Sequence, residues 1–458
     1  MTNIRTRFAP SPTGYLHIGS ARTALYCYLF AKKNKGTFIL RIEDTDLERS
    51  SQESVQAILD GMQWLNLSYD EGPFYQTKRF DRYYAVIKQL LDEGHAYRCY
   101  CSKERLEKLR EEQTANKEKP RYDGHCREMT EILDQDFVVR FKNPKDGVVE
   151  FDDLIRGKIS VANAELDDLI IARTDGTPTY NFTVVVDDWD MKITHVIRGD
   201  DHINNTPRQI NILRALGATL PLYAHMPMIL GSDGKRLSKR HGAVSVLQYH
   251  EDGILPEALI NYLVRLGWSH GDQEIFSMDE LISYFEVSDI NNSPAAFNED
   301  KLLWLNQHYI KHGNPVHVVK ELAWQMQRHN IDISKGPVLI DVLSAQSERA
   351  KTLKEMAERS RYFYEDVVIS DEMKTHFVDE VKPVLREIAT AWQHLPEFDK
   401  ASIHQVLVDA AEKSGLKLGK IAQPIRVAMT GGTVSPSIDI TVALIGRERA
   451  VERLLRVC

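Results

Sequence analysis

The chain has 458 residues, 43% hydrophobic and 27% charged, with a formal net charge of −8. This length exceeds one compact core, so we expect about two to four domains. The negative charge argues against a histone-like nucleic-acid binder, although phosphate groups respond to local basic clusters. No stretch reaches the roughly 18 uncharged apolar residues of a membrane span, and no apolar run follows the early arginines as in a secretory signal. The five cysteines suggest no disulfide framework, so we expect a cytoplasmic protein.

The N-terminal part alternates between predicted strands and helices. A buried strand over 4–9 is followed by a turn that contains two prolines and a glycine. Apolar spacing then predicts a helix over 21–33, a strand over 37–42, and helices around 55–65 and 80–93. This order is typical of a parallel α/β sheet of the nucleotide-binding kind.

An insertion is expected from about Tyr97. It holds a cysteine cluster, a charged helix over 103–117, and hairpin-like alternation through 148–151 and 158–161. The β/α pattern then resumes, with the segments 180–186 and 193–197, a helix over 206–216 and a strand over 223–230. After residue 240 the strand signals fade and helical periodicity dominates, as in 257–266 and 349–364. The predicted fold is a split Rossmann-type α/β domain with an α+β insertion, followed by an all-α C-terminal region.

The block His17-Ile-Gly-Ser20 lies where a strand and a turn lead into a helix. Backbone N–H groups and the positive helix end suit a phosphate there. Gly19 lets a ligand approach the backbone closely, and His17 can donate a hydrogen bond to a phosphate oxygen. The same residues fit a plain helix start, with Ser20 as the N-cap and His17 on the surface.

A second block, Gly234-Lys-Arg-Leu-Ser-Lys-Arg240, places four cations within residues 235–240. Such a loop can close over a polyphosphate, with Lys239 neutralising charge on the departing oxygens. The alternative is a solvated basic turn. The two blocks lie about 220 residues apart and flank the two halves of the α/β domain, which favours a nucleotide site.

These blocks resemble the two signature motifs of class I aminoacyl-tRNA synthetases. Together with their flanking segments, they make essentially the whole chain resemble the bacterial glutamyl-tRNA synthetase family. The flanking segments are Arg7–Gly14, Arg41–Asp46, Thr177–Asn181, Val196–His202, Gly415–Lys420 and Pro424–Arg426. Ser20, Leu237 and Arg240 depart from the consensus in ways that the family tolerates.

The resemblance implies a reaction and a domain plan. It implies that L-glutamate is activated with ATP and Mg²⁺ and transferred to the 3′-terminal adenosine of tRNA(Glu), and that tRNA is needed for efficient activation. A monomer without a membrane partner is expected. The implied domains are 1–96 and 181–240 for the split catalytic domain, 97–180 for an acceptor-stem-binding insertion, 241–308 for a stem-contact helical region and 309–458 for a helical anticodon-binding domain.

The resemblance also assigns site residues. His17 and Lys239 are the expected catalytic residues. The residues expected to bind ATP are His17, Gly19, Asp201, His202, Arg236, Leu237, Ser238 and Lys239. Arg7 is assigned to the substrate's side-chain carboxylate, because a guanidinium–carboxylate pair discriminates against glutamine. Glu43 is assigned to the α-ammonium group, and Ala9, Ser11, Tyr180 and Arg198 complete the glutamate pocket. Alternatively, Glu43 belongs to an acidic turn and Tyr180 to the core.

The cysteine cluster suggests a zinc site. Cys99, Cys101 and, after 24 further residues, Cys126 supply three soft ligands, whereas structural zinc takes four. The candidates for the fourth are Tyr122, His125 and Glu128. The resemblance favours Tyr122, because relatives that hold zinc here use a tyrosine at that place. The alternative is three reduced cysteines without metal.

The helical C-terminal half suits recognition of an anticodon loop, where arginines and aromatic rings read single-stranded bases. The candidates for tRNA binding are Arg349, Arg359, Arg361, Lys417, Lys420 and Arg426, with Tyr362 and Tyr364 for stacking. Each of these also fits a solvated helix face.

Sequence features distinguish three other functions from this one. A glutaminyl-tRNA synthetase has a β-barrel C-terminal half, whereas this one is expected to be helical. A shortened relative that glutamylates a modified tRNA base lacks the anticodon domain. A regulator without activity would be expected to have lost His17, Lys239 or Arg7, and all three are present.

Overall fold

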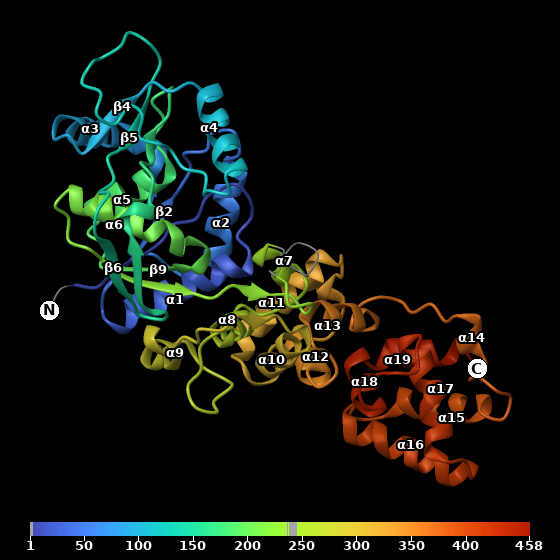
Figure 1. Cartoon of the computed structure of the whole chain (residues 1–458). Coiled ribbons are helices and arrows are strands. Elements are labelled where there is room, and N and C mark those ends of the chain that lie inside the picture. Colours follow the sequence, from blue (N-terminus) through green and yellow to red (C-terminus); the bar gives the residue numbers. More distant parts are fainter. Residues whose placement is uncertain (1–2, 236, 238–244) are drawn as a thin grey trace. The chain divides into compact units, whose positions relative to one another are not determined.

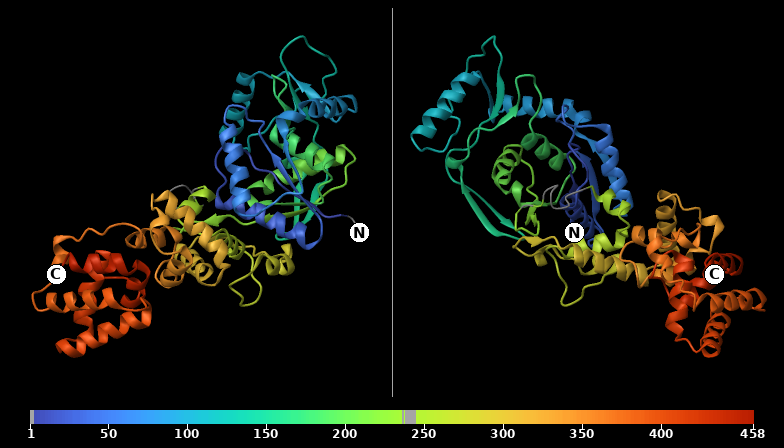
Figure 2. Two further views of the ribbon diagram at one scale, coloured as in Figure 1. Left: turned by 180° about the vertical axis from the view of Figure 1, so that it is seen from behind. Right: turned by 90° about the vertical axis from the view of Figure 1, so that its right-hand side faces the viewer.

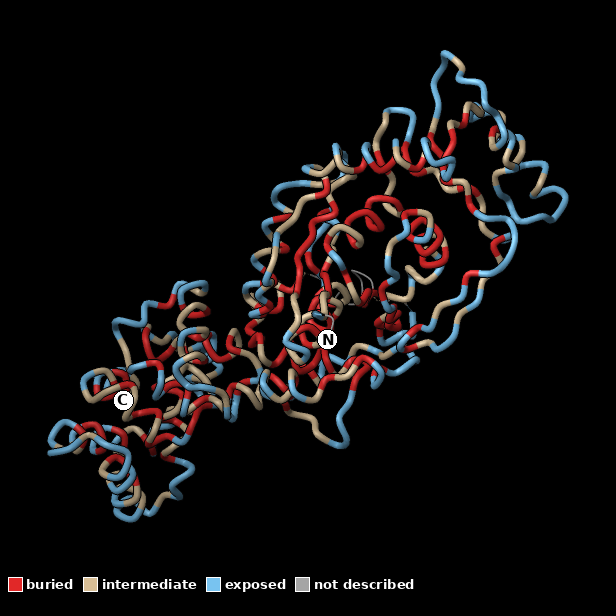
Figure 3. Tube along the Cα trace, turned by 90° about the vertical axis from the view of Figure 1, so that its left-hand side faces the viewer, coloured by how far each residue is buried: buried red, intermediate tan, exposed pale blue. Residues whose placement is uncertain are grey.

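The computed structural model describes residues 3–235, 237 and 245–458. The chain folds into two compact units. Unit 1 comprises Met1–Leu247 and Ile260–Asn298, and unit 2 comprises Gln248–Leu259 and Glu299–Cys458. The buried residues, red in Figure 3, concentrate in the interior of each unit. In the described part of the chain, no helix is both long and apolar enough to cross a membrane.

Unit 1 begins with a parallel sheet in the order β1-β2-β3. Its strands are β1 (Arg5–Phe8), β2 (Thr37–Ile42) and β3 (Glu71–Tyr75). Helices α1 (Ile18–Lys33) and α2 (Gln52–Trp64) make the crossovers, and η1 (Gln76–Arg79) and α3 (Phe80–Asp92) follow β3. β2 is buried along almost its whole length, as expected for a strand in a covered parallel sheet. The strand over 37–42 is confirmed, and the first helix begins three residues earlier than predicted.

The second half of the α/β fold supplies another sheet, in the order β7-β6-β10-β9. β9 (His195–Gly199) and β10 (Leu222–Met226) are parallel, and η3 (Asp200–Asn205) and α6 (Thr206–Ala215) connect them. The N–H of Thr194 donates to the Arg5 carbonyl at 3.0 Å, so β9 lies beside β1. The two halves, far apart in sequence, are therefore neighbours within unit 1 (Figure 2).

The valine-rich segment 180–186 has a composition typical of a strand, yet it is part of helix α5 (Tyr180–Asp190). All residues from Phe182 to Asp188 are buried. A helix that is buried on nearly all sides shows no amphipathic period, and tertiary packing overrides the preference of valine for strands.

The insertion contains a small antiparallel sheet, a helix and a hairpin. The sheet holds β4 (Ala96–Cys99), β5 (Val138–Phe141) and β8 (Ile170–Ala172), and the charged helix is α4 (Lys103–Ala115). The predicted hairpin is confirmed as β6 (Val148–Asp153) and β7 (Gly157–Ala162), followed by η2 (Asn163–Glu165). β6 also pairs with β10, so the hairpin extends the sheet of the second half.

The predicted strand over 223–230 is split into β10 and β11 (Ile229–Leu230). Pro227 lies in the gap and has no N–H to donate to a neighbouring strand. β11 pairs with β12 (Ala295–Ala296), a strand that the sequence did not indicate. The remaining elements before residue 298 that the structure describes are α7 (Val246–Glu251), α8 (Pro256–Arg265), α9 (Met278–Tyr284) and η5 (Val287–Asp289).

Unit 2, which is described throughout, contains helices and no strand, as predicted. Its helices after residue 298 are α10 (Glu299–His312), α11 (Pro315–Arg328), η6 (Ile333–Lys335), α12 (Leu339–Gln346), α13 (Leu353–Arg359), η7 (Arg361–Phe363), α14 (Asp371–Lys374), α15 (Lys382–His394), α16 (Lys400–Ser414), α17 (Leu418–Thr430), α18 (Ile438–Ile445) and α19 (Arg447–Leu455). Helices α15 to α19 pack into one bundle (Figure 1).

The helix predicted over 349–364 is shorter than expected. It consists of α13 and the 3₁₀ turn η7. Thr352 caps the start of α13 by accepting from the N–H of Glu355 at 3.1 Å. The N–H of Ser360 is shared between the carbonyls of Met356 and Ala357, which tightens the last turn.

Two glycines of unit 2 allow a test of close backbone packing. Gly253 (φ +80°) and Gly415 (φ +71°) are both left-handed, but a Cβ at Gly253 would lie 2.2 Å from the Lys354 nitrogen, whereas Gly415 has open space. We expect Gly415→Ala to lower the free energy of unfolding by about 1 kcal/mol, from backbone strain alone. Gly253→Ala should cost clearly more. Thermal unfolding followed by circular dichroism compares the two, and equal losses would contradict the packing.

Candidate functional site

His17 caps the start of α1. Its Nδ1 accepts hydrogen bonds from the N–H groups of Gly19 (3.1 Å) and Ser20 (3.3 Å). A neutral ring that accepts at Nδ1 carries its proton on Nε2, which lies 3.1 Å from the Ser20 hydroxyl. Ser20 is therefore the third residue of the helix and not its N-cap, so that interpretation was wrong.

The close approach of the His17 ring explains Gly19. A Cβ at position 19 would lie 3.1 Å from two atoms of the ring, closer than ordinary contact. The two N–H groups that suit a phosphate are thus held by the imidazole, and a phosphate would bind them by displacing it.

A network of buried charged side chains lies in unit 1. Asp188, near the end of α5, accepts from Arg7 Nε at 3.2 Å and from Arg41 Nη1 at 2.8 Å. Arg41 Nη2 also donates to Glu43 Oε1 at 3.1 Å, directly after β2. Arg7 and Glu43 were predicted to bind opposite charges of one ligand. They are linked to each other through Asp188 and Arg41.

Asp187 belongs to the same network of buried charges through Arg41. Its carboxylate accepts from Gln76 Nε2 (2.8 Å), Arg79 Nε (2.7 Å) and the Tyr83 hydroxyl (2.9 Å), and lies 3.5 Å from Arg41 Nε. The sequence interpretation named neither aspartate. Their signal was an acidic pair that ends an apolar run.

Burial and charge act against each other in this network. Burial raises the pKa of Glu43 to about 7, against the pull of Arg41 and Arg7. Burial also disfavours ionised Asp188, but Arg7 and Arg41 outweigh it and hold the pKa of Asp188 below its usual value. Asp188 is therefore ionised at neutral pH, whereas Glu43 titrates there.

Arg198, on β9, is buried without an acidic partner. Its Nε donates to His225 Nε2 at 3.1 Å and its Nη2 to the Thr206 hydroxyl at 2.8 Å. Among the described residues, no carboxylate pairs with it and its Nη1 has no hydrogen-bond partner. Burial lowers the pKa of this guanidinium. A buried cation without a counter-charge is costly, so the site favours an anionic ligand.

Tyr180 and His202 lie beside these groups. The Tyr180 hydroxyl is 3.1 Å from His202 Nδ1. Burial, helped by the charge of Glu43, raises the pKa of Tyr180 to about 12, and burial beside Arg198 lowers the pKa of His202 to about 4. Arg7, Glu43, Tyr180 and Arg198 are thus close enough to influence one another electrostatically.

The other predicted ligand contacts are more exposed. The N–H of Glu43 donates to the Pro10 carbonyl at 2.9 Å, which ties Glu43 to the turn that carries Ala9 and exposed Ser11. Asp201 is exposed on η3, and the N–H of Leu237 donates to the Ile229 carbonyl at 3.0 Å. The remaining predicted residues of the basic loop, Arg236, Ser238, Lys239 and Arg240, lie outside the described residues.

The three cysteines of the insertion form a cluster. The Sγ atoms of Cys99, Cys101 and Cys126 lie within 4.8 Å of one another. The Tyr122 hydroxyl is 3.4 Å from Cys99 Sγ and 3.8 Å from Cys101 Sγ, and it accepts from the N–H of Cys126 at 2.9 Å. The guanidinium of Arg140 stacks on the Tyr122 ring at 3.8 Å and holds it in place.

The two alternative fourth ligands do not join this cluster. Exposed Glu128 pairs with Arg127 at 3.7 Å and with Lys142 at 3.2 Å. His125 is also exposed and is not part of the cluster. Of the three candidates, only Tyr122 has its donor atom beside the sulfurs.

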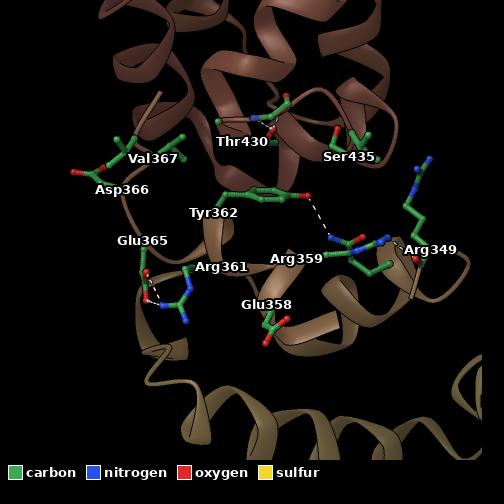
Figure 4. Close-up of a pocket in the computed structure, with 15 residues that line it drawn as sticks. Arg349, Glu358, Arg359, Arg361, Tyr362, Glu365, Asp366, Val367, Thr430 and Ser435 are labelled. Atoms are coloured by element: carbon green, nitrogen blue, oxygen red, sulfur yellow. Dashed lines mark hydrogen bonds and ion pairs between the residues drawn. The ribbon is translucent and has the colours of Figure 1, made fainter. Parts of the chain in front are cut away.

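Unit 2 has a cavity of about 700 Å³ between α12, η7 and the α17–α18 connection. Arg349, Arg359 and Arg361 line it, together with Tyr362, whose hydroxyl accepts from Gln346 Nε2 at 3.3 Å (Figure 4). Arg359 pairs with Glu355 and Arg361 with Glu365, whereas the guanidinium of exposed Arg349 makes no hydrogen bond or ion pair within the described chain.

The other predicted tRNA contacts do not line the cavity. Arg426 lies near it, and its Nε donates to Ser435 Oγ at 3.0 Å. Lys417 and Lys420 are exposed at the start of α17. Tyr364 is buried, and its hydroxyl donates to the Pro337 carbonyl at 2.9 Å, so its ring is not offered for stacking.

Known proteins match the chain over nearly its full length. Residues 3–304 match the family described as tRNA synthetases class I (E and Q), catalytic domain, and residues 315–458 match an anticodon binding domain. A relative named Glutamate–tRNA ligase 1 from Coxiella burnetii is 62% identical, with 99% of this chain and 97% of the relative covered. A relative of the same name from Alkalilimnicola ehrlichii is 60% identical, with the same shares covered.

A solved structure matches as well. The crystal structure of a glutamate tRNA ligase from Elizabethkingia meningosepticum, in complex with its amino acid, has a TM-score of 0.87 and 32% identity, and 99% of each chain is covered. The chain therefore belongs to the class I tRNA synthetases (E and Q), with the catalytic domain of that family followed by an anticodon-binding domain.

Proposed function

We propose that the protein is a glutamate–tRNA ligase that activates L-glutamate with ATP and transfers it to tRNA(Glu). The observation that carries the substrate specificity is the buried Arg198, which forms no ion pair with any described residue and lies near Arg7 and Tyr180. Glutamate bears one more negative charge than glutamine at neutral pH. A pocket with an uncompensated guanidinium therefore prefers glutamate, and the named relatives are glutamate–tRNA ligases.

Each group of the pocket has a role in this proposal. Arg7 and Arg198 bind the carboxylate side of the substrate, since guanidinium groups donate to carboxylates in fixed geometry. Glu43 binds the α-ammonium group, with Ser11 and the backbone of Ala9 beside it. Tyr180 closes the pocket through its hydroxyl group.

The activation step needs no protein nucleophile. The α-carboxylate of glutamate attacks the α-phosphorus of ATP and pyrophosphate leaves, so the protein contributes positioning and charge stabilisation. His17, Gly19, Asp201, His202 and the 236–239 segment are proposed to bind ATP, with Lys239 stabilising the departing phosphates. Mg²⁺, when bound, supplies further neutralisation of the phosphate charge. The adenylate then gives its acyl group to the 2′-hydroxyl of the terminal adenosine.

The helical unit 2 separates this proposal from its nearest rival. A glutaminyl-tRNA synthetase is expected to carry a β-barrel there, and unit 2 contains no strand. The cavity lined by Arg349 and Tyr362 supports the anticodon assignment, with Arg359, Arg361 and Arg426 around it and Lys417 and Lys420 on the phosphate backbone.

The activation assay tests the function directly. We expect ATP–pyrophosphate exchange with glutamate in the presence of tRNA, and little exchange without tRNA or with glutamine in place of glutamate. Equal exchange with glutamine would show that the proposed pocket does not select glutamate. Equal exchange without tRNA would remove the proposed role of tRNA in activation.

The ionisation of Glu43 gives a second test. Its pKa lies near 7, so its charge, and with it the attraction for the substrate ammonium, appears as the pH rises through this value. Glutamate binding, measured by calorimetry without ATP, should therefore strengthen from pH 6 to pH 8 and level off above. Well below the pKa of Glu43, the association constant for glutamate should rise by about tenfold per pH unit.

Three neighbouring groups, Asp188, Tyr180 and His202, titrate outside this window. The pKa of Asp188 is below its usual value, that of Tyr180 is about 12 and that of His202 about 4. Glu43→Gln should bind glutamate weakly and without pH dependence. If the variant keeps the pH dependence of the original protein, Glu43 is not its source.

We propose that the insertion holds one structural zinc ion between Cys99, Cys101, Cys126 and Tyr122. Three thiolates are the donor set that zinc prefers, and the phenolic oxygen lies beside two of the sulfurs. Zinc, when bound, would fix the connection between β4 and the loop that carries Tyr122.

Metal analysis tests this site. We expect about one zinc per chain. Tyr122→Phe should retain less zinc under dialysis against a chelator, whereas His125→Ala should retain as much as the unmodified protein. Loss of zinc in the His125 variant, or none in the original protein, would refute the ligand set.

The protein is also proposed to act as a cytoplasmic monomer, in keeping with its family. Its proposed partners are tRNA(Glu) and L-glutamate.

A further inference from the structure

Arg198 is held by two side chains that carry no charge in this arrangement. Its Nε donates to His225 Nε2 at 3.1 Å, and its Nη2 donates to Thr206 Oγ1 at 2.8 Å. The Thr206 hydroxyl is itself 3.0 Å from His225 Nε2. The Nε–Nη2 edge of the guanidinium is therefore occupied, which leaves Nη1 for a ligand.

The donor and acceptor roles determine the state of His225. Arginine only donates hydrogen bonds, so Nε2 of His225 must accept and cannot carry a proton. The proton of the neutral ring then lies on Nδ1, which is 2.6 Å from Asp153 Oδ2. Burial lowers the pKa of His225, which agrees with a neutral ring.

Asp153 is itself held firmly. Its Oδ1 accepts from the N–H groups of Ile155 (3.0 Å) and Arg156 (2.9 Å) in the turn between β6 and β7. The backbone N–H of His225 also donates to its Oδ2 at 3.1 Å. The Asp153 and His225 side chains are both fully buried.

We propose that Asp153 and His225 are positioning residues for glutamate binding: Asp153 fixes the Nδ1–H form of His225, and His225 then holds Arg198 in the pocket. This rests on the proposed function, because it takes Arg198 as a contact of the substrate carboxylate. Neither residue contacts the substrate. Asp153 belongs to the insertion hairpin, so the pair also ties that hairpin to the pocket.

Two variants disrupt the hydrogen bonds from Asp153 through His225 to Arg198 at different points. His225→Asn keeps a donor toward Asp153 but loses the acceptor for Arg198. In Asp153→Asn, the amide oxygen must face the N–H groups of Ile155 and Arg156, so the amide NH₂ faces His225 Nδ1. His225 then carries its proton on Nε2, so its Nε2–H and the Nε–H of Arg198 are two donors that face each other.

Three further variants serve as controls. His225→Gln places an amide oxygen near the position of Nε2 and should recover function. His195 is a buried histidine on neighbouring β9 that contacts Thr194 and Phe30 but not Arg198, so His195→Asn reports the cost of losing a buried imidazole alone. Arg198→Lys tests the pocket itself.

Steady-state pyrophosphate exchange with saturating tRNA measures KM for glutamate and for ATP. We expect His225→Asn and Asp153→Asn to raise KM for glutamate by roughly tenfold or more, while KM for ATP stays within about twofold. His225→Gln should recover most of the loss, and His195→Asn should leave KM for glutamate unchanged.

The outcomes separate this proposal from the function on which it rests. If Arg198→Lys raises KM for glutamate and the His225 and Asp153 variants do not, the positioning roles are wrong. A parallel rise in both KM values, or no recovery in His225→Gln, also overturns them by showing a merely structural role. If Arg198→Lys itself leaves KM for glutamate unchanged in an active enzyme, the pocket assignment fails instead.

Discussion

The ion pairs of Asp188 with Arg7 and Arg41 hold together three segments of the proposed glutamate pocket. β1, β2 and α5 each contribute one of these charges, and none of the three side chains is more than 7% exposed. Burying charged groups costs several kcal/mol each unless they pair with good geometry, and breaking one buried pair costs about 3–5 kcal/mol. The sheet of β1 and β2 and helix α5 therefore have little freedom to shift relative to one another within unit 1.

The same ion pairs give the two pocket arginines different tasks. Arg7 already has a counter-charge in Asp188, so its position is fixed before any ligand arrives. Among the described residues Arg198 has only neutral hydrogen-bond partners, so its charge remains available for an anionic ligand. In the proposed function, both arginines meet the carboxylate side of the substrate, and the charge of Arg198 is the one that is not already paired. The assignment of the discrimination against glutamine to Arg7 stays a prediction, and the sequence motif gave no sign that Asp188 pairs with Arg7.

Local patterns predicted the parts of the site that depend on local structure. The helix after His17, the strand before Glu43 and the β6–β7 hairpin all follow short-range signals, and the structure confirms them. Asp153 and His225 are 72 residues apart and meet only because β6 pairs with β10, a register that no local signal reveals. Helix α5 was equally hidden, since burial on all sides removes the periodicity by which a helix is recognised.

The proposed pocket of unit 1 and the cavity of unit 2 each combine arginines that pair with acids and an arginine that does not. Among the described residues, Arg7 and Arg41 pair with acids in unit 1 and Arg198 does not, and Arg359 and Arg361 pair with acids in the cavity of unit 2 and Arg349 does not. An arginine that already pairs with an acid gains less from a further anion, because part of its charge is already neutralised. An unpaired arginine keeps the whole interaction for the ligand. In the proposed function, specificity for the glutamate side chain and for an anticodon base is therefore expected to depend on these two side chains more than on the arginines around them.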